Sequence, residues 1–322
     1  AALTDHMGDS LLADHIAARE PDILGLSCYL WNSERSLHLA REVKARSPRT
    51  FVIIGGPEVT QDNAFLLDQS GYDVAVFGEG EEVFASILDR IASGRDFEGI
   101  PGVAWLTGAG LCGDRSSTPI AFPLDRYPSP YLARRLAIDP TRSTYLETVR
   151  GCRSACNFCY YPKSNTALRA LDPEHTRALV EHLVAGGARD LVFLDPTFNH
   201  RPRFQEVLDA LARANPDRLA SMFGEVRAER LTQSQVMSMA RAGFNRVEIG
   251  LQTASRATLK RIGRGGNPER VATVSNRFRD QGIDLLIDLL VGLPGERAGD
   301  VEASVQFLLE HDLGSFAQVF AL

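Results

Sequence analysis

The chain has 322 residues, of which 44% are hydrophobic and 24% charged, and its formal net charge is −6. This composition is ordinary for a globular protein and leaves room for two domains. A negative balance without a basic block argues against a dedicated nucleic-acid binder. No run of about twenty apolar residues is present, and the first ten residues lack the features of a signal peptide. Five cysteines, three of them clustered, do not fit a disulfide framework, so we expect a protein of the reducing cytoplasm.

Residues 1 to about 110 predict a first α/β unit. An apolar stretch at 23–26 precedes a helical pattern that places Leu37, Ala40 and Val43 on one face. The buried-strand pattern TFVIIGG comes next, and a further strand and helix follow in DVAVFGEGEEVFASIL. The alternation of strand, helix and strand at this spacing predicts a parallel sheet with crossover helices.

A second series of strands begins at Thr144, after a stretch rich in Pro, Ser, Arg and Asp that favours an interdomain connection. Its six apolar strand patterns are spaced very roughly thirty residues apart, which predicts a barrel or partial barrel of βα units. The predicted strands are TYLETV, DLVFLD, LASMFGEV, RVEIGLQ, DLLIDLLVG and SFAQVFAL. We assign residues 1–125 to the first domain, 126–143 to the linker and 144–322 to the second domain.

Three cysteines follow the first strand of this second series directly, in the stretch VRGCRSACNFCY. Cys152, Cys156 and Cys159 would therefore lie at the carboxyl edge of the predicted barrel, where active groups gather. Their unequal spacing allows one loop to surround a bulky 4Fe–4S cluster, with three thiolates on three irons and the fourth iron open. A structural zinc site with a distant fourth ligand is the alternative, although no histidine stands at a short ligand spacing from the loop.

The pattern Cys-x3-Cys-x2-Cys, with Phe158 before the third cysteine, resembles the signature of the radical SAM superfamily. The resemblance extends over residues 144–322 and implies a partial (β/α)6 TIM-type barrel. It implies that the open iron binds the amino and carboxylate groups of S-adenosylmethionine (SAM). The reduced cluster would then cleave SAM to a 5′-deoxyadenosyl radical, which removes hydrogen from an unactivated carbon.

The same resemblance implies a set of SAM contacts at the ends of the barrel strands. Glu225 ends the third strand, and Glu248 and Gln252 stand four apart around a glycine, a spacing that keeps both on one face of a regular strand. A carboxylate inside an apolar strand is costly without a partner, which favours a functional role over a surface charge. Asp288 remains open between a structural role and a place in the site. The candidate SAM contacts are Phe158, Tyr160, Thr197, Glu225, Glu248 and Gln252.

Three stretches of the first domain, GLSCYLWN, IIGGPEVT and VFGEGEEVF, resemble the cobalamin (B12)-binding domain that precedes the barrel in one large subfamily. The fold that this implies is Rossmann-like. Glycines at strand ends allow backbone amides to approach a flat macrocycle or a phosphate closely. The candidate cobalamin contacts are Ser27, Tyr29, Trp31, Gly55, Gly56, Glu58, Gly78, Glu79 and Gly80.

Two departures from that domain stand out. Its usual first strand would lie upstream of residue 1, and the motif Asp-x-His-x-x-Gly that supplies a lower axial histidine is absent. We hypothesise that Trp31 faces the lower side of the cobalt and keeps it without a protein nitrogen ligand. The alternative is that Trp31 packs against the helix that begins at Asn32. Cys28 and Cys112 have no assigned role, and the chain ends inside an apolar run, so we expect further residues beyond both ends.

The resemblance implies a cobalamin-dependent radical SAM enzyme, most simply a methyltransferase acting on an unactivated carbon. A second reading keeps both cofactors but has the enzyme catalyse a rearrangement or cyclisation without methyl transfer. A tRNA methylthiotransferase would carry three further cysteines in the first domain, which offers only Cys28 and Cys112. A non-catalytic cobalamin or metal sensor is the fourth reading. The implied partners are a small-molecule or peptide substrate and a flavodoxin or ferredoxin, while the catalytic residues and the substrate are not assigned.

Overall fold

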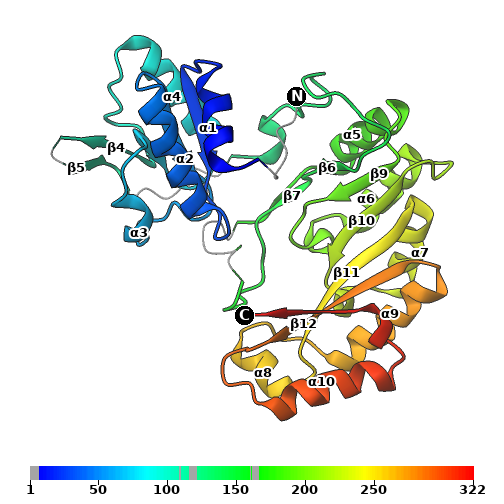
Figure 1. Ribbon diagram of the computed structural model, residues 1–322. Coiled ribbons are helices and arrows are strands. Elements are labelled where there is room, and N and C mark those ends of the chain that lie inside the picture. The colour runs from blue at the N-terminus through cyan, green and yellow to red at the C-terminus, as the bar shows by residue number, and fades with distance from the viewer. Residues whose placement is uncertain (1–6, 109, 116–121, 160, 162–166) are drawn as a thin grey trace. The chain divides into compact units, whose positions relative to one another are not determined.

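The structure, a computed structural model, describes residues 7–108, 110–115, 122–159, 161 and 167–322. The chain divides into two compact units, Ala1–Ala121 and Phe122–Leu322. Each unit is an α/β fold built on its own sheet (Figure 1), and the expected α/β fold class is confirmed. Residues 126–143, which we expect to form a linker, are counted with the second unit.

The sheet of the first unit has five strands in the order β1-β2-β3-β4-β5. The first three strands are parallel to one another, β4 pairs antiparallel with β3, and β5 pairs antiparallel with β4. Its strands are β1 (Ile23–Ser27), β2 (Phe51–Gly55), β3 (Val74–Val76), β4 (Val103–Thr107) and β5 (Gly110–Gly113). Its helices are α1 (Asp9–Ala17), α2 (Ser33–Arg46), α3 (Ala64–Leu67) and α4 (Glu81–Ser93).

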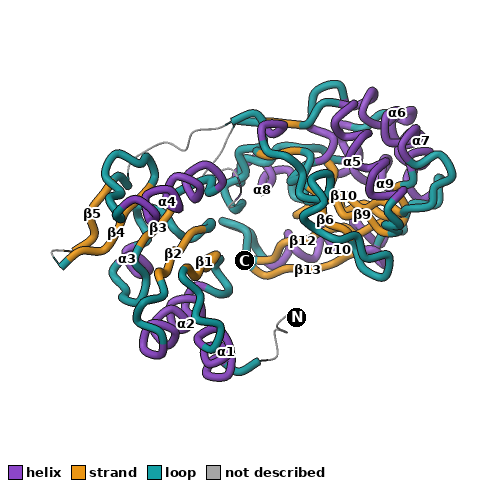
Figure 2. The backbone as a smooth tube through the Cα atoms, turned by 90° about the horizontal axis from the view of Figure 1, so that it is seen from above, coloured by secondary structure: helices purple, strands orange, loops and turns teal. Residues whose placement is uncertain are grey.

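Helices cover both faces of this sheet. Seen from above in Figure 2, α1 and α2 lie on one side of the strands and α4 lies on the other. The predicted apolar face of α2 is confirmed, since Leu37, Ala40 and Val43 are all buried. On the opposite face Ile87 of α4 packs in one cluster with Phe51 of β2. The strand β2 is buried from both sides, which explains its continuous apolar run.

The sheet of the second unit has six parallel strands in the order β13-β12-β11-β10-β9-β6. It is open, with β6 and β13 as its edge strands, as expected for a partial barrel. The strands are β6 (Thr144–Leu146), β9 (Asp190–Phe193), β10 (Ser221–Val226), β11 (Phe244–Gln252), β12 (Asp284–Val291) and β13 (Ala317–Ala321).

The first predicted strand of this unit is shorter than expected. TYLETV pairs with β9 only as far as Leu146, and the chain then enters a separate two-stranded ribbon. This ribbon consists of β7 (Val149–Arg150) and β8 (Arg169–Ala170). The strand breaks here because the backbone amides of Thr148 and Val149 donate to the side chain of Asp195 instead of to a neighbouring strand.

The helices of the second unit lie on the outer side of the curved sheet (Figure 1). They are α5 (Pro173–Ala185), α6 (Phe204–Ala214), α7 (Gln233–Ala242), α8 (Arg256–Arg261), α9 (Pro268–Asp280) and α10 (Ala298–Glu310), with short 3-10 turns at Leu124–Arg126, Phe198–His200, Ala228–Arg230 and Gly314–Phe316. Local signals set their ends: Asp172 caps α5 ahead of Pro173, and Gly186 follows its last turn. Within the described residues, no helix combines the length and hydropathy needed to cross a membrane.

The main core of the second unit lies between the sheet and these helices. Phe193, Phe198 and Phe244 form its aromatic centre, with ring centroids 4.8–5.8 Å apart. Because this packing fixes the strands, it also fixes the loops at their carboxyl ends, where the polar residues predicted from the sequence are found.

Candidate functional site

The loop that carries the three cysteines, residues 151–159 (the Cys loop), begins directly after β7. Its stem is held by Asp195, which follows β9. One carboxylate oxygen accepts from the amides of Thr148 (2.6 Å) and Val149 (2.7 Å), and the other accepts from the Thr148 hydroxyl (2.6 Å). Arg201 lies 3.8 Å from the same carboxylate, and both side chains are fully buried.

The far end of the Cys loop rests on α8. The amide of Asn157 donates to the carbonyl of Ile262 at 2.8 Å, and its side chain donates to the carbonyl of Arg261 at 3.3 Å. Phe158 packs against the apolar cluster that includes Leu259 and Ile262. The loop is therefore held at two places by two elements that are distant in the sequence.

The three thiols are free and differ in their surroundings. Cys152 lies 3.9 Å from the Thr197 hydroxyl and accepts from the amide of Ser154 at 3.4 Å. Cys156 is buried and in contact with the guanidinium of Arg264. Burial, followed by the proximity of the other two thiols, raises the pKa of Cys159. A thiol in such a place stays protonated until a metal ion displaces its proton.

Three free thiols on one loop are a donor set that fits an iron–sulfur cubane. Among the residues that the structure describes, no three His, Cys, Asp or Glu side chains are placed to hold one metal ion together. In a cubane each thiolate binds a different iron, so the three sulfur atoms need not converge on one point. The N–H groups of Ser154 and Arg264 next to the sulfur atoms also suit a thiolate ligand.

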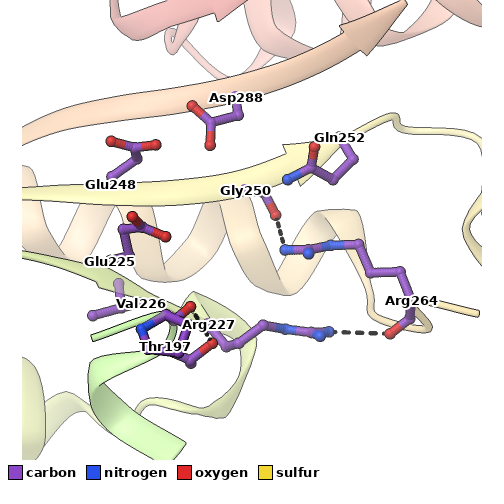
Figure 3. A pocket seen from close by; sticks show the side chains of 10 residues that line it. Thr197, Glu225, Val226, Arg227, Glu248, Gly250, Gln252, Arg264 and Asp288 are labelled. Atoms are coloured by element: carbon purple, nitrogen blue, oxygen red, sulfur yellow. Dashed lines mark hydrogen bonds between the residues drawn. The ribbon is translucent and has the colours of Figure 1, made fainter. Parts of the chain in front are cut away.

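A pocket opens beside the Cys loop at the carboxyl ends of β9, β10, β11 and β12 (Figure 3). It encloses about 340 Å³ of space, part of it open to solvent. Thr197, which contacts Cys152, forms part of its wall. We call it the carboxylate pocket; its walls are Pro196, Thr197, Glu225, Val226, Arg227, Glu248, Gly250, Gln252, Arg264 and Asp288.

Three acidic side chains from three adjacent strands meet in this pocket. The pKa of Glu225 is raised to about 7, first by the protein packed around it and then by the charges of Asp288 and Asp195, although the residue is exposed on the pocket wall. Burial raises the pKa of Glu248 to about 8, followed by the charges of Asp288 and Glu225. Burial also raises the pKa of Asp288, while its hydrogen bonds to Gln318 (2.7 Å) and Glu248 oppose that rise. At neutral pH this cluster therefore holds protons and presents O–H donors as well as acceptors.

The side chains of Gln252 and Arg264 both lie beside Gly250, and Figure 3 shows Arg264 bonded to the Gly250 carbonyl. The Arg264 guanidinium donates to the carbonyl of Gly250, and a Cβ at Gly250 would meet the Gln252 amide and come within 2.9 Å of Arg264. The side-chain oxygen of Gln252 is buried and finds no hydrogen-bond partner among the described residues, and only 7% of the residue is exposed. An orphaned acceptor in a pocket wall is a place for a ligand to donate.

The route by which Gln252 reaches the pocket differs from the expected one. Alternation along a regular strand was expected to place Glu248 and Gln252 on one face, and both do line the pocket. The pairing of β11 with β12, however, is irregular between Gly250 and Gln252, and Gln252 has a left-handed backbone (φ 70°). A β-bulge therefore turns this side chain over Gly250.

Three buried or partly buried charged residues were not predicted from the sequence: Asp195, Arg227 and Arg264. Arg227 directly follows β10, pairs with Glu229, and donates to the Ser154 hydroxyl in the Cys loop at 3.2 Å. Each follows a strand or helix end, as active groups in such barrels do. Aspartate and arginine are common in loops, so the sequence alone does not mark these three residues as part of the site. Their contacts in the structure do.

In the first unit the candidate residues gather at the carboxyl ends of β1, β2 and β3. Ser27 pairs with Gly55, and the amide of Glu58 donates to the carbonyl of Cys28 at 3.1 Å. Gly56 has φ 105°, and a Cβ there would lie 2.8 Å from the Cys28 carbonyl oxygen. The two loops are thus in contact along their backbones, and only glycine fits between them.

The third candidate turn, Gly78-Glu79-Gly80, leads from β3 into α4. Gly78 has φ 83°, and a Cβ on Gly80 would lie more than 4 Å from every other described residue apart from its chain neighbours. This turn thus leaves open space beside its backbone, as the approach of a large ligand requires.

An aromatic pair stands on the loop after β1. The rings of Tyr29 and Trp31 stack with centroids 4.7 Å apart, and Trp31 is 79% exposed. That exposure does not favour the alternative in which Trp31 packs against α2. Flat apolar surface beside glycine turns fits the approach of a macrocycle. Cys28 is fully buried, with its pKa raised to about 11 by burial and Glu58, and Cys112 is exposed on β5.

The structure therefore brings the candidate residues together in two groups. The Cys loop joins the carboxylate pocket through Cys152 and Thr197, with Glu225, Glu248 and Gln252 in its walls. Phe158 packs away from that pocket, against the α8 cluster. Tyr160 lies outside the described residues.

Comparisons with known families find one match within each of the two units. Residues 146–308 match the model of the radical SAM superfamily, and residues 4–88 match that of the B12 binding domain.

Related proteins are longer than this chain. A 2-(S-pantetheinyl)-carbapenam-3-carboxylate methyltransferase from Streptantibioticus cattleyicolor is 29% identical, over 90% of this chain and 45% of its own length. The cobalamin-dependent radical SAM methyltransferase TokK from Streptomyces tokunonensis is 28% identical, over 93% and 46%. The structure of the radical SAM methyltransferase TsrM from Kitasatospora setae, with cobalamin and a [4Fe-4S] cluster bound, superposes with a TM-score of 0.78 at 20% identity, covering 97% of this chain and 66% of that one. The chain thus spans a little under half of the two curated relatives.

Proposed function

Since this chain belongs to the radical SAM superfamily, we propose that it forms the cofactor-binding part of a cobalamin-dependent enzyme that methylates an unactivated carbon. The observation that carries the proposal is the contact of the Cys loop with the carboxylate pocket, through Cys152 and Thr197. When bound, a 4Fe–4S cluster supplies the electron that cleaves SAM, and cobalamin supplies the methyl group. The two curated relatives, which are named as methyltransferases, support methyl transfer over other outcomes.

Cys152, Cys156 and Cys159 would hold the cluster. The Ser154 amide and the Arg264 guanidinium donate to or contact two of these sulfurs and would stabilise them as thiolates. Since Arg264 also binds the carbonyl of Gly250, it fixes the distance between the Cys loop and the pocket wall.

SAM would occupy the carboxylate pocket, with Thr197, Glu225, Glu248 and Gln252 in contact and Phe158 and Tyr160 beside the Cys loop. The pocket offers acceptors for a ligand that is rich in hydroxyl and amino donors, above all the unpartnered oxygen of Gln252. Protonated Glu225 and Glu248 would lose their protons, or share them, when a cationic ligand enters.

Cobalamin would bind at the carboxyl edge of the first sheet. Ser27, Gly55 and Gly56 would admit its nucleotide tail, with Glu58 beside them, and the turn Gly78-Glu79-Gly80 would line the corrin. Tyr29 and Trp31 would lie against the ring, with Trp31 on the lower side of the cobalt. The exposure of the aromatic pair supports this, because the pair is available to cover a flat ligand.

The remaining partners follow from the chemistry. Reductive cleavage needs a one-electron donor, for which we propose a flavodoxin or ferredoxin. We propose a small-molecule or peptide substrate and a location in the reducing cytoplasm, where free thiols persist.

The test is anaerobic reconstitution of the full-length protein, with iron, sulfide and cobalamin counted per chain. SAM carrying an isotopically labelled methyl group is then supplied with a strong reductant and candidate substrates. We expect about four irons, one cobalamin, 5′-deoxyadenosine and a labelled product. A variant with Cys152→Ala, Cys156→Ala and Cys159→Ala is the control and should lose the iron while it keeps the cobalamin.

Other outcomes have defined meanings. Deoxyadenosine with an unmethylated, altered product would indicate a rearrangement or cyclisation. Failure to cleave SAM with the cluster present would indicate a sensor, and a single zinc ion in place of iron would overturn the proposal.

A further inference from the structure

We propose that Asp195 is a positioning residue for the Cys loop: its carboxylate holds the stem of the loop and so fixes Cys152 relative to Cys156 and Cys159. The inference rests on the proposed function, because it treats the three thiols as ligands of one cluster. The contacts themselves are independent of any ligand.

The stem is held by a set of buried polar contacts that centres on Asp195 and Arg201. Asp195 accepts three hydrogen bonds of 2.6–2.7 Å from the two residues Thr148 and Val149. Arg201 binds the Thr148 hydroxyl at 2.7 Å and continues to the carbonyl of Leu171 at 2.7 Å, where the chain returns from the Cys loop. The two chain segments that enter and leave the loop region are thus joined through one ion pair.

The charge of Asp195 matters as well as its shape. Both oxygens accept from N–H or O–H donors, and an amide in this place would offer only one acceptor oxygen and no negative charge opposite Arg201. Burial raises the pKa of Asp195 to about 6, while Thr148 and Arg201 hold it down, which leaves the group ionised at pH 7. Removal of the carboxylate would also leave the cation of Arg201 buried without a counter-charge.

The effect of this network on the thiols is unequal. Cys152 stands three residues after Val149, and its sulfur lies 3.9 Å from Thr197, which is two residues after Asp195. Cys152 is therefore connected to Asp195 in two ways, along the chain from Val149 and through the contact with Thr197.

The other two thiols have a separate support. Asn157, between Cys156 and Cys159, is bonded to the carbonyls of Arg261 and Ile262 on α8. Loss of the Asp195 contacts should therefore release Cys152 while Cys156 and Cys159 stay in place. A loop with one loose thiol would hold a cubane by two firm ligands only.

The experiment measures how fast each cysteine of the metal-free, full-length protein reacts with iodoacetamide, by peptide mass spectrometry. Asp195→Ala is compared with Asn215→Ala. Asn215 is a matched control because it is fully buried and makes three hydrogen bonds, to Ala220 and Ala242, at the opposite ends of the strands. We expect alkylation of Cys152 to accelerate about tenfold or more in Asp195→Ala, since one hydrogen bond to a charged group is worth about that factor. Cys156 and Cys159 should change by less than about threefold, and Asn215→Ala should leave the ratio of the three rates unchanged.

Two further variants keep the test decisive if Asp195→Ala folds poorly. Asp195→Asn and Thr148→Val preserve side-chain size, and each should accelerate Cys152 selectively, with Thr148→Val the weaker because the backbone bonds remain. Acceleration of all three cysteines together, or of none, would overturn the inference.

A second measurement separates this inference from the proposed function. Release of iron from the reconstituted protein to a chelator should be faster in Asp195→Asn than in the wild type. If the wild type binds no cluster, the proposed function fails, while the alkylation result still decides the role of Asp195.

Discussion

The two units place their candidate residues at the same edge of a parallel sheet, and each edge depends on a glycine for a different reason. At Gly56 a side chain would meet the backbone of Cys28, and φ is 105°. At Gly250 the atoms nearest to a new side chain belong to the side chains of Gln252 and Arg264, and φ is not positive. The first edge is shaped by backbone contacts, whereas the second is shaped by movable side chains.

The difference extends to charge. The first edge presents the exposed rings of Tyr29 and Trp31 beside its glycine turns. The second withdraws Glu225, Glu248 and Asp288 from water and raises the pKa of all three. One edge is suited to a large flat ligand that lies against it, and the other to a smaller polar ligand that enters it. Substitution of Gly56 at the first edge should therefore alter folding, and substitution of Gly250 at the second should alter binding.

The largest expected effect is that of Gly56→Ala. The substitution forces a Cβ against the Cys28 backbone at a φ that side chains avoid, so the first unit should lose about 2–4 kcal/mol in its free energy of unfolding. Urea denaturation followed by circular dichroism measures this loss. Gly80→Ala is the control, because a Cβ there meets nothing within 4 Å and φ is −90°. Equal losses in the two variants would contradict the backbone contact.

Gly250→Ala should leave the fold intact and weaken ligand binding. The new methyl group displaces the Gln252 amide and the Arg264 guanidinium, both of which can move. Since at least one polar contact to the ligand is lost, SAM affinity should fall about tenfold. Isothermal titration of the reconstituted protein measures the affinity, and a thermal scan of the same sample checks the fold. If the melting temperature fell together with the affinity, Gly250 would be needed for the fold as Gly56 is, and the two edges would not differ in this respect.

Glu248→Gln should stabilise the ligand-free protein in mildly alkaline solution. The folded protein holds the Glu248 proton up to a pKa of about 8, against an ordinary value of 4.5. The stability contributed by that proton is complete below pH 4.5 and is lost as the pH rises through 8. The neutral amide avoids this loss, so the variant should melt about 2–4 °C higher than the wild type at pH 8.5.

At pH 5 the two proteins should melt at similar temperatures, because Glu248 is then protonated in the folded wild type. Glu206→Gln is a suitable control, since that carboxylate is exposed and paired with Arg203, which lowers its pKa. A gain for Glu248→Gln that is equal at pH 5 and pH 8.5 would show that the carboxyl group is not titrating in this range.

The smallest effect is expected for Trp31→His, which should change the spectrum of bound cobalamin and little else. The ring is 79% exposed, so its loss removes little packing from the fold. If residue 31 faces the lower side of the cobalt, an imidazole there supplies the nitrogen ligand that tryptophan does not. An electronic absorption spectrum of the bound cobalamin detects this ligand, and an unchanged spectrum would place Trp31 elsewhere.

Much of the fold was predictable because strands and helices alternate with clear apolar patterns. The six strands of the second unit and the apolar face of α2 follow from periodicity alone. The break after Leu146 was not predictable, because it depends on the side chain of Asp195, 49 residues away. Contacts between distant segments leave no local pattern.

The candidate site was predictable to a similar degree. The cysteine spacing and the two glutamates inside apolar strands are local signals, and the structure places the glutamates in one pocket. The contribution of Gln252 depends on a bulge that the sequence alternation does not reveal. In the sequence, Arg227 and Arg264 resemble ordinary charged loop residues. Only their contacts with the Cys loop identify them as part of the site.

The two supports of the Cys loop also set an order of assembly. The loop occupies residues 151–159, yet one support is Asp195 and the other is the carbonyl pair of Arg261 and Ile262. A nascent chain that has not yet been synthesised as far as residue 262 therefore has its cysteines but lacks the frame that arranges them. Iron and sulfide would therefore meet a fully supported set of thiols only after translation has passed α8.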